Sequence, residues 1–186
     1  KMLFASVAGY AMDGLDMLIL SFAMTAILKE FGISFAEGGM IATYTLIGAV
    51  IGGYVFGIMA DYVGRVRVFA LTIIVFSVFT GLCALSSSVM ELNIYRFLAG
   101  LGLGGEFGIG MTLVAETWPA AKRARATAGV AIGWQLGVVI AALLAAAVIP
   151  VYGWRGLFLV GTLPALFAAW SRYGLPEPDI WVERRR

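Results

Sequence analysis

Long apolar runs alternate with short polar connections along nearly the whole chain. The pattern predicts six membrane-spanning helices, at residues 3–28, 38–60, 66–85, 92–115, 127–149 and 154–173. Each run has about 20 residues or more, which at about 1.5 Å per residue is enough to cross the hydrocarbon core of a bilayer. Because the connections are short, we expect neighbouring helices to run antiparallel. The sequence therefore predicts an all-α membrane protein.

The composition agrees with this prediction and excludes several functions. Of the 186 residues, 61% are hydrophobic and 13% are charged, whereas a soluble domain has about 25% charged residues. The net charge of only +2, with the basic residues in the connections, argues against nucleic-acid binding. With one cysteine and no histidine, we expect no disulfide framework and no metal site. Nothing supports an intramembrane enzyme, so we expect no catalytic residues.

The lysines and arginines are distributed unevenly between the two sides of the predicted membrane. Ten fall on one side, namely Lys1, Arg65, Arg67, Lys122, Arg123, Arg125, Arg172 and Arg184, Arg185 and Arg186. Only Lys29 and Arg155 fall on the other side, and Arg96 lies inside the fourth segment. Because cytoplasmic connections are enriched in Lys and Arg, both termini are predicted to be cytoplasmic.

Two of the apolar segments contain charged residues. The first holds Asp13 and Asp16, and the fourth holds Arg96 and Glu106. A charge near the middle of a membrane costs several kcal/mol if it faces lipid. Asp13 and Asp16 are three residues apart and share one helix face, so this face is predicted to line a wet cavity. An interhelical pair, or a cap at a kink near Gly14, is the open alternative.

These charges are the candidates for proton and substrate coupling. In a chain without histidine a proton relay must use carboxyl groups, and burial disfavours their charged form. We predict Asp16 as the first proton site, with Asp13 setting its environment and Glu106 as a second site. Arg96 lies about 15 Å from Glu106 along the helix, so each needs a partner on another helix, or water. Arg96 is predicted to balance a carboxylate substrate or an acidic side chain; a structural role is the alternative.

The connection between the second and third predicted helices carries the motif Gly57-x-x-x-Asp61-x-x-Gly64-Arg65-x-Arg67. A turn this short favours a residue that tolerates positive φ, and Gly64 is one. The motif resembles the signature loop between helices 2 and 3 of the major facilitator superfamily. It departs from that pattern in having a valine between the two arginines.

The resemblance extends over the whole chain, to the N-terminal six-helix half of these proteins. Asp13-Gly14-Leu15-Asp16, Arg96-x-x-x-Gly100, Gly105-Glu106 and Gly153-Trp154-Arg155 together resemble the aromatic acid and sialic acid proton symporters. The resemblance implies two inverted three-helix repeats, with the first and fourth helices lining the cavity. It also implies a six-helix bundle at 1–174, the start of a cytoplasmic linker at 175–186, and a second six-helix half, from a missing C-terminal half or another copy.

The function that the resemblance implies is secondary active transport, as proton-coupled symport of a small organic anion such as an aromatic acid, sialic acid or a similar carboxylate. The proton gradient, and no cofactor, would drive it, in the plasma (inner) membrane of a bacterium. A sugar or polyol carrier, a drug exporter, and a membrane scaffold or sensor that does not transport remain as alternatives.

The connection between the fourth and fifth predicted helices is expected to face the motif loop. It contains Glu116 and Arg125, and the motif loop contains Asp61 and Arg65. Carboxylate and guanidinium groups at this face are predicted to form a bidentate network that gates the conformational change. Positive charge that only sets the topology is the alternative.

Overall fold

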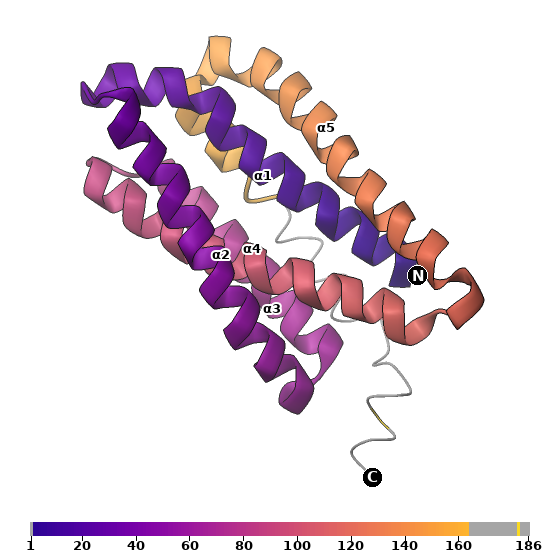
Figure 1. Cartoon of the computed structure of the whole chain (residues 1–186). Helices are drawn as coiled ribbons and strands as arrows, with labels where there is room; N and C mark the ends of the chain where they lie inside the picture. Colours follow the sequence, from indigo (N-terminus) through magenta and orange to yellow (C-terminus); the bar gives the residue numbers. More distant parts are fainter. Residues whose placement is uncertain (1, 164–181, 183–186) are drawn as a thin grey trace.

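The structure is a computed structural model that describes residues 2–163 and residue 182. The described residues form five helices, α1 (Met2–Phe31), α2 (Phe35–Val63), α3 (Arg65–Cys83), α4 (Val89–Thr117) and α5 (Ala120–Val160). Each of the five is long and apolar enough to cross a membrane. They form one elongated bundle, in which consecutive helices run in opposite directions (Figure 1). The predicted all-α membrane architecture is confirmed.

The number of helices differs from the prediction of six. α5 has 41 residues and contains both the predicted fifth helix and the start of the predicted sixth. The two parts meet at Gly153, whose φ of +67° is not helical. The ribbon turns back at this point in Figure 1. The rest of the predicted sixth helix, from residue 164, and the predicted linker at 175–186 lie outside the described residues.

Side-chain caps set the starts of α2 and α4. Ser34 and Glu37 form a capping box, in which the backbone N–H of Ser34 donates to Glu37 (2.8 Å) and that of Glu37 donates to Ser34 Oγ (3.3 Å). At α4 the backbone N–H of Glu91 donates to Ser88 Oγ (3.2 Å). Such bonds satisfy N–H groups that a helix cannot pair internally. Gly64, with φ of +127°, separates α2 from α3, which confirms the predicted positive φ.

Small residues let α2 and α4 approach closely. A Cβ added to Gly52 would overlap the backbone of Leu101, and one added to Gly104 would overlap that of Ala49. Gly57, in contrast, faces open space. Without a hydrophobic force between helices in lipid, close backbone packing of this kind drives their association.

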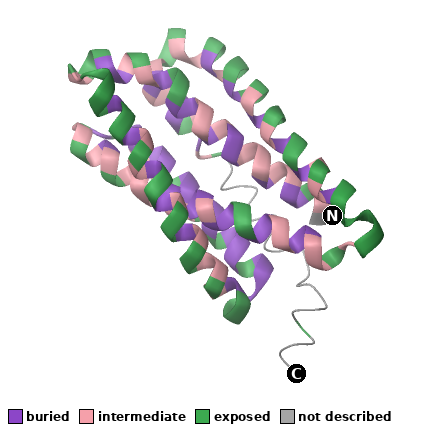
Figure 2. Ribbon diagram, in the orientation of Figure 1, coloured by how far each residue is buried: buried purple, intermediate pink, exposed green. Residues whose placement is uncertain are grey.

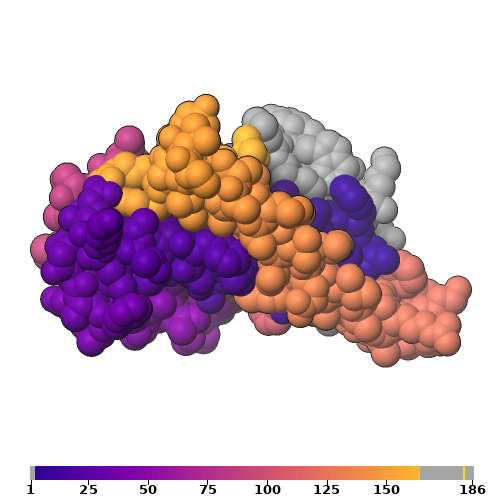
Figure 3. Space-filling view, turned by 90° about the horizontal axis from the view of Figure 1, so that it is seen from above, coloured from indigo at the N-terminus to yellow at the C-terminus, as the bar shows by residue number. Residues whose placement is uncertain are grey.

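The same arrangement joins α1 to α5. Gly133 and Gly137 of α5 lie against the carbonyl groups of Val7 and Ala11, whereas Gly129 has no neighbour within 4 Å of an added Cβ. Figure 3 shows α5 lying directly against α1. The helices that pack most closely are α1 with α5 and α2 with α4. Neither pair is consecutive in the sequence.

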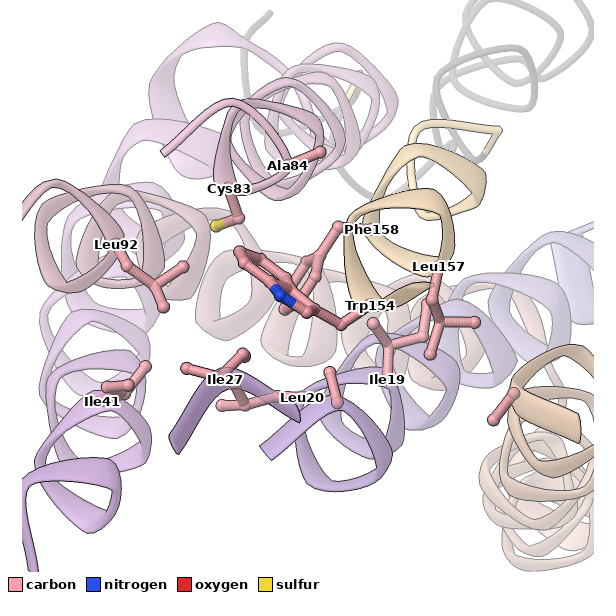
Figure 4. Close-up of a cluster of buried hydrophobic side chains, with 12 residues drawn as sticks. Ile19, Leu20, Ile27, Ile41, Cys83, Ala84, Leu92, Trp154, Leu157 and Phe158 are labelled. Atoms are coloured by element: carbon pink, nitrogen blue, oxygen red, sulfur yellow. The ribbon is translucent and has the colours of Figure 1, made fainter. Parts of the chain in front are cut away.

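Buried apolar side chains fill the space between the helices. One cluster joins the C-terminal half of α1 to α3, α4 and the last part of α5, around Trp154 and Phe158 (Figure 4). A second cluster, around Phe69 and Phe76, joins α3 to α4 and α1. The outer surfaces of α2 and α5 are largely exposed (Figure 2) and carry large apolar side chains such as Val50 and Leu143. Such a surface suits contact with lipid.

Candidate functional site

A buried ion pair joins α1 to α4 in the interior of the bundle. Arg96 Nη2 donates to Asp16 Oδ2 at 2.8 Å, and Nη1 donates to Asp16 Oδ1 at 3.2 Å. Thr80 Oγ1 of α3 also donates to Asp16 Oδ1 (2.7 Å), and Arg96 Nε donates to Thr45 Oγ1 of α2 (3.2 Å). Four helices thus meet at this pair, and the two charged side chains are 0% and 1% exposed.

The geometry explains how these charges are tolerated at this depth. Taking two ions out of water is compensated only when they are well paired and their remaining atoms are hydrogen-bonded. Here the guanidinium group forms a two-pronged contact, and it also lies 5.9 Å from the ring centroid of Phe158. The expectation that Arg96 needs a partner on another helix is confirmed. For Asp16 the structure shows the interhelical pair that the sequence left open as an alternative.

Asp13 and Glu106 form a second buried group, away from this pair. They line a small cavity of about 10 Å³, which is close to the smallest volume that holds one water molecule. Both side chains are almost fully buried. Among the described residues, neither carboxyl oxygen of Glu106 nor Oδ1 of Asp13 has a hydrogen-bond partner. Gly9 makes room for Glu106, since an added Cβ would come within 2.5 Å of its Oε1.

This group has a direct chemical consequence. Two neighbouring carboxyl groups that share a buried site cannot both be ionised without a nearby cation, because burial and mutual repulsion both oppose it. Arg96, the only fully buried base among the described residues, is already bonded to Asp16. One of the two carboxyl groups, Asp13 or Glu106, can therefore hold a proton.

An open pocket of about 540 Å³ is also lined by Asp13. Four aromatic side chains line it, Tyr10, Tyr54, Phe107 and Trp134. The ring centroid of Tyr10 lies 5.2 Å from that of Phe107 and 5.5 Å from that of Trp134. The remaining lining is mostly apolar, and no lysine or arginine contributes to it within the described part of the chain. The volume suits a small organic molecule.

A network at one end of the bundle contains part of the predicted gate. Arg65 Nη2 contacts Asp61 Oδ1 (2.7 Å) and Glu116 Oε1 (3.2 Å), and so joins the ends of α2 and α4 to the start of α3. The shortest contacts to the two acids both come from the same nitrogen of Arg65. Arg125 is exposed, and no ion pair connects it to this network among the residues described. Arg67 is also exposed.

Several residues of the site were not predicted from the sequence. Thr45 and Thr80 look like ordinary polar points in apolar helices, and no local signal links them to Asp16. Tyr10 is three residues before Asp13, so the shared helix face was a usable signal. Trp134 joins the pocket only because α5 packs on α1. Glu30, which binds Arg155 at the opposite end of the bundle, was also missed.

Comparison with known proteins places this geometry in a family. The family model of the Major Facilitator Superfamily matches residues 7–186. A Haemophilus influenzae protein named for metabolite transport, with no substrate in its name, is 53% identical over 185 residues, which are 100% of this chain and 46% of that protein. The sialic acid transporter NanX of Escherichia coli is 36% identical over 183 residues, covering 98% of this chain and 45% of NanX.

A third relative extends the range of named substrates. The cis,cis-muconate transport protein of Acinetobacter baylyi is 38% identical over 183 residues, covering 98% of this chain and 44% of that protein. The chain thus spans about half the length of the curated relatives it matches.

Solved structures share the fold. The partially occluded inward-open xylose transporter XylE from Escherichia coli has a TM-score of 0.83 at 21% identity, over 99% of this chain and 50% of XylE. A bacterial homolog of the human lysosomal transporter Spinster, inward-facing and occupied, also has a TM-score of 0.83 at 21% identity, over 95% of this chain and 44% of that protein. At this identity the likeness concerns the fold alone. The chain is an integral, multi-pass membrane protein that belongs to the major facilitator superfamily and covers the N-terminal half of its fold.

Proposed function

We propose that the chain is one half of a proton-coupled symporter of small organic anions. The observation that carries this proposal is the position of Asp13, which lines both the open pocket and the small cavity that it shares with Glu106. One carboxyl group thereby connects a space for substrate to a site for a proton. The substrates named for NanX and the muconate protein are both carboxylic acids, which favours the same class here.

The lining of the pocket suits the apolar part of the substrate better than its carboxylate group. Tyr10, Phe107 and Trp134 offer aromatic faces and edges, on which a planar or apolar molecule can pack. Arg96 does not line the pocket and is fully buried against Asp16. The cation that binds the substrate carboxylate would then come from the second six-helix half.

Proton coupling would use Asp13 and Glu106 together, with Asp16 held by Arg96. A carboxyl pair that carries one proton becomes neutral when it gains a second proton and regains its negative charge when that proton leaves. Coupling to a proton gradient requires such a change of charge. Opening the cavity to water on one side would allow that proton to exchange. The pair of Asp16 and Arg96 would keep α1 and α4 in register while this happens.

The network of Asp61, Arg65 and Glu116 would hold one end of the bundle in a single conformation. Alternating access requires such contacts to form and break as the two halves move. Gly64 allows the tight turn that places Arg65 between the two acids. Gly57, Arg67 and Arg125 would act at the surface of the same loops, where the second half is expected.

The orientation in the membrane follows from the charges of the connections. The positive-inside rule places the Arg65 end of the bundle and both termini in the cytoplasm, in a bacterial inner membrane. Two inverted three-helix repeats, with a sixth helix after Gly153, would complete this half. Its partners would be the bilayer, protons, the organic anion and the second half.

Uptake measurements with the protein that contains both halves test the proposal. We expect radiolabelled aromatic or sugar acids to accumulate in proteoliposomes when the outside is acidic, and to equilibrate without a gradient. The chain alone should give no saturable uptake. Gradient-driven uptake of a neutral sugar, export of a drug, or no transport of any of these compounds would contradict the proposal and favour the respective alternative.

A further inference from the structure

A second network lies at the end of the bundle opposite to Arg65. Glu30, near the end of α1, accepts hydrogen bonds from Trp154 Nε1 (2.6 Å) and from Arg155 Nη1. Arg155 Nη2 donates to the carbonyl oxygen of Ser86 (3.0 Å), in the connection between α3 and α4. The guanidinium group also lies 4.3 Å from the ring centroid of Trp154. We call these four residues the Glu30–Arg155 clamp.

The basic residues of the two networks occupy matching positions. Arg65 follows Gly64, whose φ is +127°, and begins α3. Arg155 follows closely after Gly153, whose φ is +67°, at the start of the last part of α5. In both places a glycine in the left-handed region turns the chain, and an arginine at the start of the next helix reaches back to an acid.

The acidic residues match as well. Glu116 is the last residue but one of α4, and Glu30 is the last residue but one of α1. Arg65 binds Glu116 at one end of the bundle, and Arg155 binds Glu30 at the other. In the second network, α1 thus takes the place of α4, and the segment after Gly153 takes the place of α3. The two networks lie at opposite ends of the bundle.

We propose that the Glu30–Arg155 clamp is the inverted counterpart of the Arg65 network, and that the two clamps lock the two three-helix repeats into one rigid body. Each clamp joins a helix of one repeat to a helix of the other, at opposite ends. The pair alone would contribute little, because both charged side chains are partly exposed. Trp154, which is buried, and the carbonyl of Ser86 fix its geometry. The proposal concerns the bundle and holds for any substrate.

Distances between spin labels, measured on the chain in lipid nanodiscs, test this inference. One label pair, Phe35→Cys with Tyr152→Cys, reports on the clamp end. A second pair, Val63→Cys with Lys122→Cys, reports on the Arg65 end. All four positions are exposed. The buried Cys83 is replaced by alanine in every variant, so that only the chosen positions react with the label.

We expect Glu30→Gln to broaden the distance distribution at the clamp end and to leave the Arg65 end unchanged. Glu116→Gln should do the reverse. Arg155→Gln should match Glu30→Gln, and the double variant should add nothing, because both remove one interaction. Lys29→Gln, a change of charge next to Glu30, is the matched control and should broaden neither.

Three results would overturn the inference. They are unchanged distributions in Glu30→Gln, broadening at both ends from either single variant, and broadening by the control. Where Glu30→Gln fails to fold, Trp154→Phe replaces it, since it removes one donor to Glu30 and keeps an aromatic ring. Narrow distributions at the clamp end in Trp154→Phe would equally reject the clamp. Transport is not measured, so failure here leaves the proposed function untouched.

Discussion

Arg96 of α4 and Asp16 of α1 face each other in the interior of the bundle, joined by two hydrogen bonds of 2.8 and 3.2 Å. This pairing divides the charges near mid-membrane into two groups. Asp16 is paired with Arg96, whereas Asp13 and Glu106 share a small cavity to which no basic residue of the described chain contributes. Each group carries a different prediction.

Loss of Arg96 should destabilise the bundle strongly. Arg96→Gln leaves Asp16 buried without its cation, and breaking a buried pair in this way costs about 3–5 kcal/mol. The double variant with Asp16→Asn should cost less than the sum of the single variants. The free energy of unfolding in mixed micelles measures this. A cost below about 1 kcal/mol, the value for an exposed ion pair, would contradict the buried pairing.

Asp13→Asn and Glu106→Gln should each abolish accumulation driven by a pH gradient and preserve exchange of substrate across the membrane. Neither amide can share a proton with the remaining carboxyl group. Uptake by the protein with both halves, with and without an imposed gradient, is the measurement. Glu37→Gln, at the exposed start of α2, is the control. Accumulation that persists in both variants would make the two acids structural.

Asp16→Asn distinguishes the two assignments for the first helix. If Asp16 is the first proton site, as predicted from the sequence, the variant folds normally and loses coupling. If Asp16 mainly holds Arg96, as its contacts indicate, the variant loses stability first. Thermal unfolding and gradient-driven uptake of the same preparation decide between them. We expect a lowered Tm, and a normal Tm with lost coupling would restore the sequence-based assignment.

Two glycines of α5 should respond differently to the same change. Gly137→Ala places a methyl group against the backbone of α1, and overpacking of this kind costs about 1–3 kcal/mol. Gly129→Ala enters open space and should gain up to about 1 kcal/mol from helix propensity. Unfolding free energies of the two variants test this. Equal effects would mean that the close contact between α1 and α5 is wrong.

Within the proposed gate, Asp61→Asn and Glu116→Gln should slow turnover more than they weaken substrate binding, since each removes one contact of Arg65. Arg125→Gln should have a smaller effect, because Arg125 lies outside the ion pairs of Arg65. Transport rates and binding constants of the three variants separate the two effects. Wild-type rates in Asp61→Asn and Glu116→Gln would leave the loops as a topological signal only.

The predicted topology can be tested with a thiol reagent that does not cross membranes. Ser87→Cys, in the exposed connection between α3 and α4, should react from outside the cell. Lys122→Cys should react only after the membrane is opened. Cys83 is buried and should give little background. Labelling of Ser87→Cys from the cytoplasmic side alone would reverse the orientation.

The sequence by itself determined the membrane character, the positions of the first four helices and the turn at Gly64. These features depend on local properties: the length of an apolar run, the short polar connections and the φ angle that glycine tolerates. Glycines spaced four residues apart in α2, α4 and α5 are also a local feature of the sequence, because this spacing places them on one face of a helix. The break before Trp154 was also anticipated, although α5 continues through the kink at Gly153.

Only the tertiary structure decided which charged groups meet. Asp13 and Asp16 look equivalent in the sequence, yet one faces Glu106 and the other faces Arg96, 80 residues away. Their partners differ because the packing of α4 against α1 brings Arg96 to Asp16 and Glu106 to Asp13. The hydroxyl groups of Thr45 and Thr80 complete the site from two further helices. A one-dimensional pattern shows that a buried charge needs a partner, but the choice of partner depends on how whole helices pack.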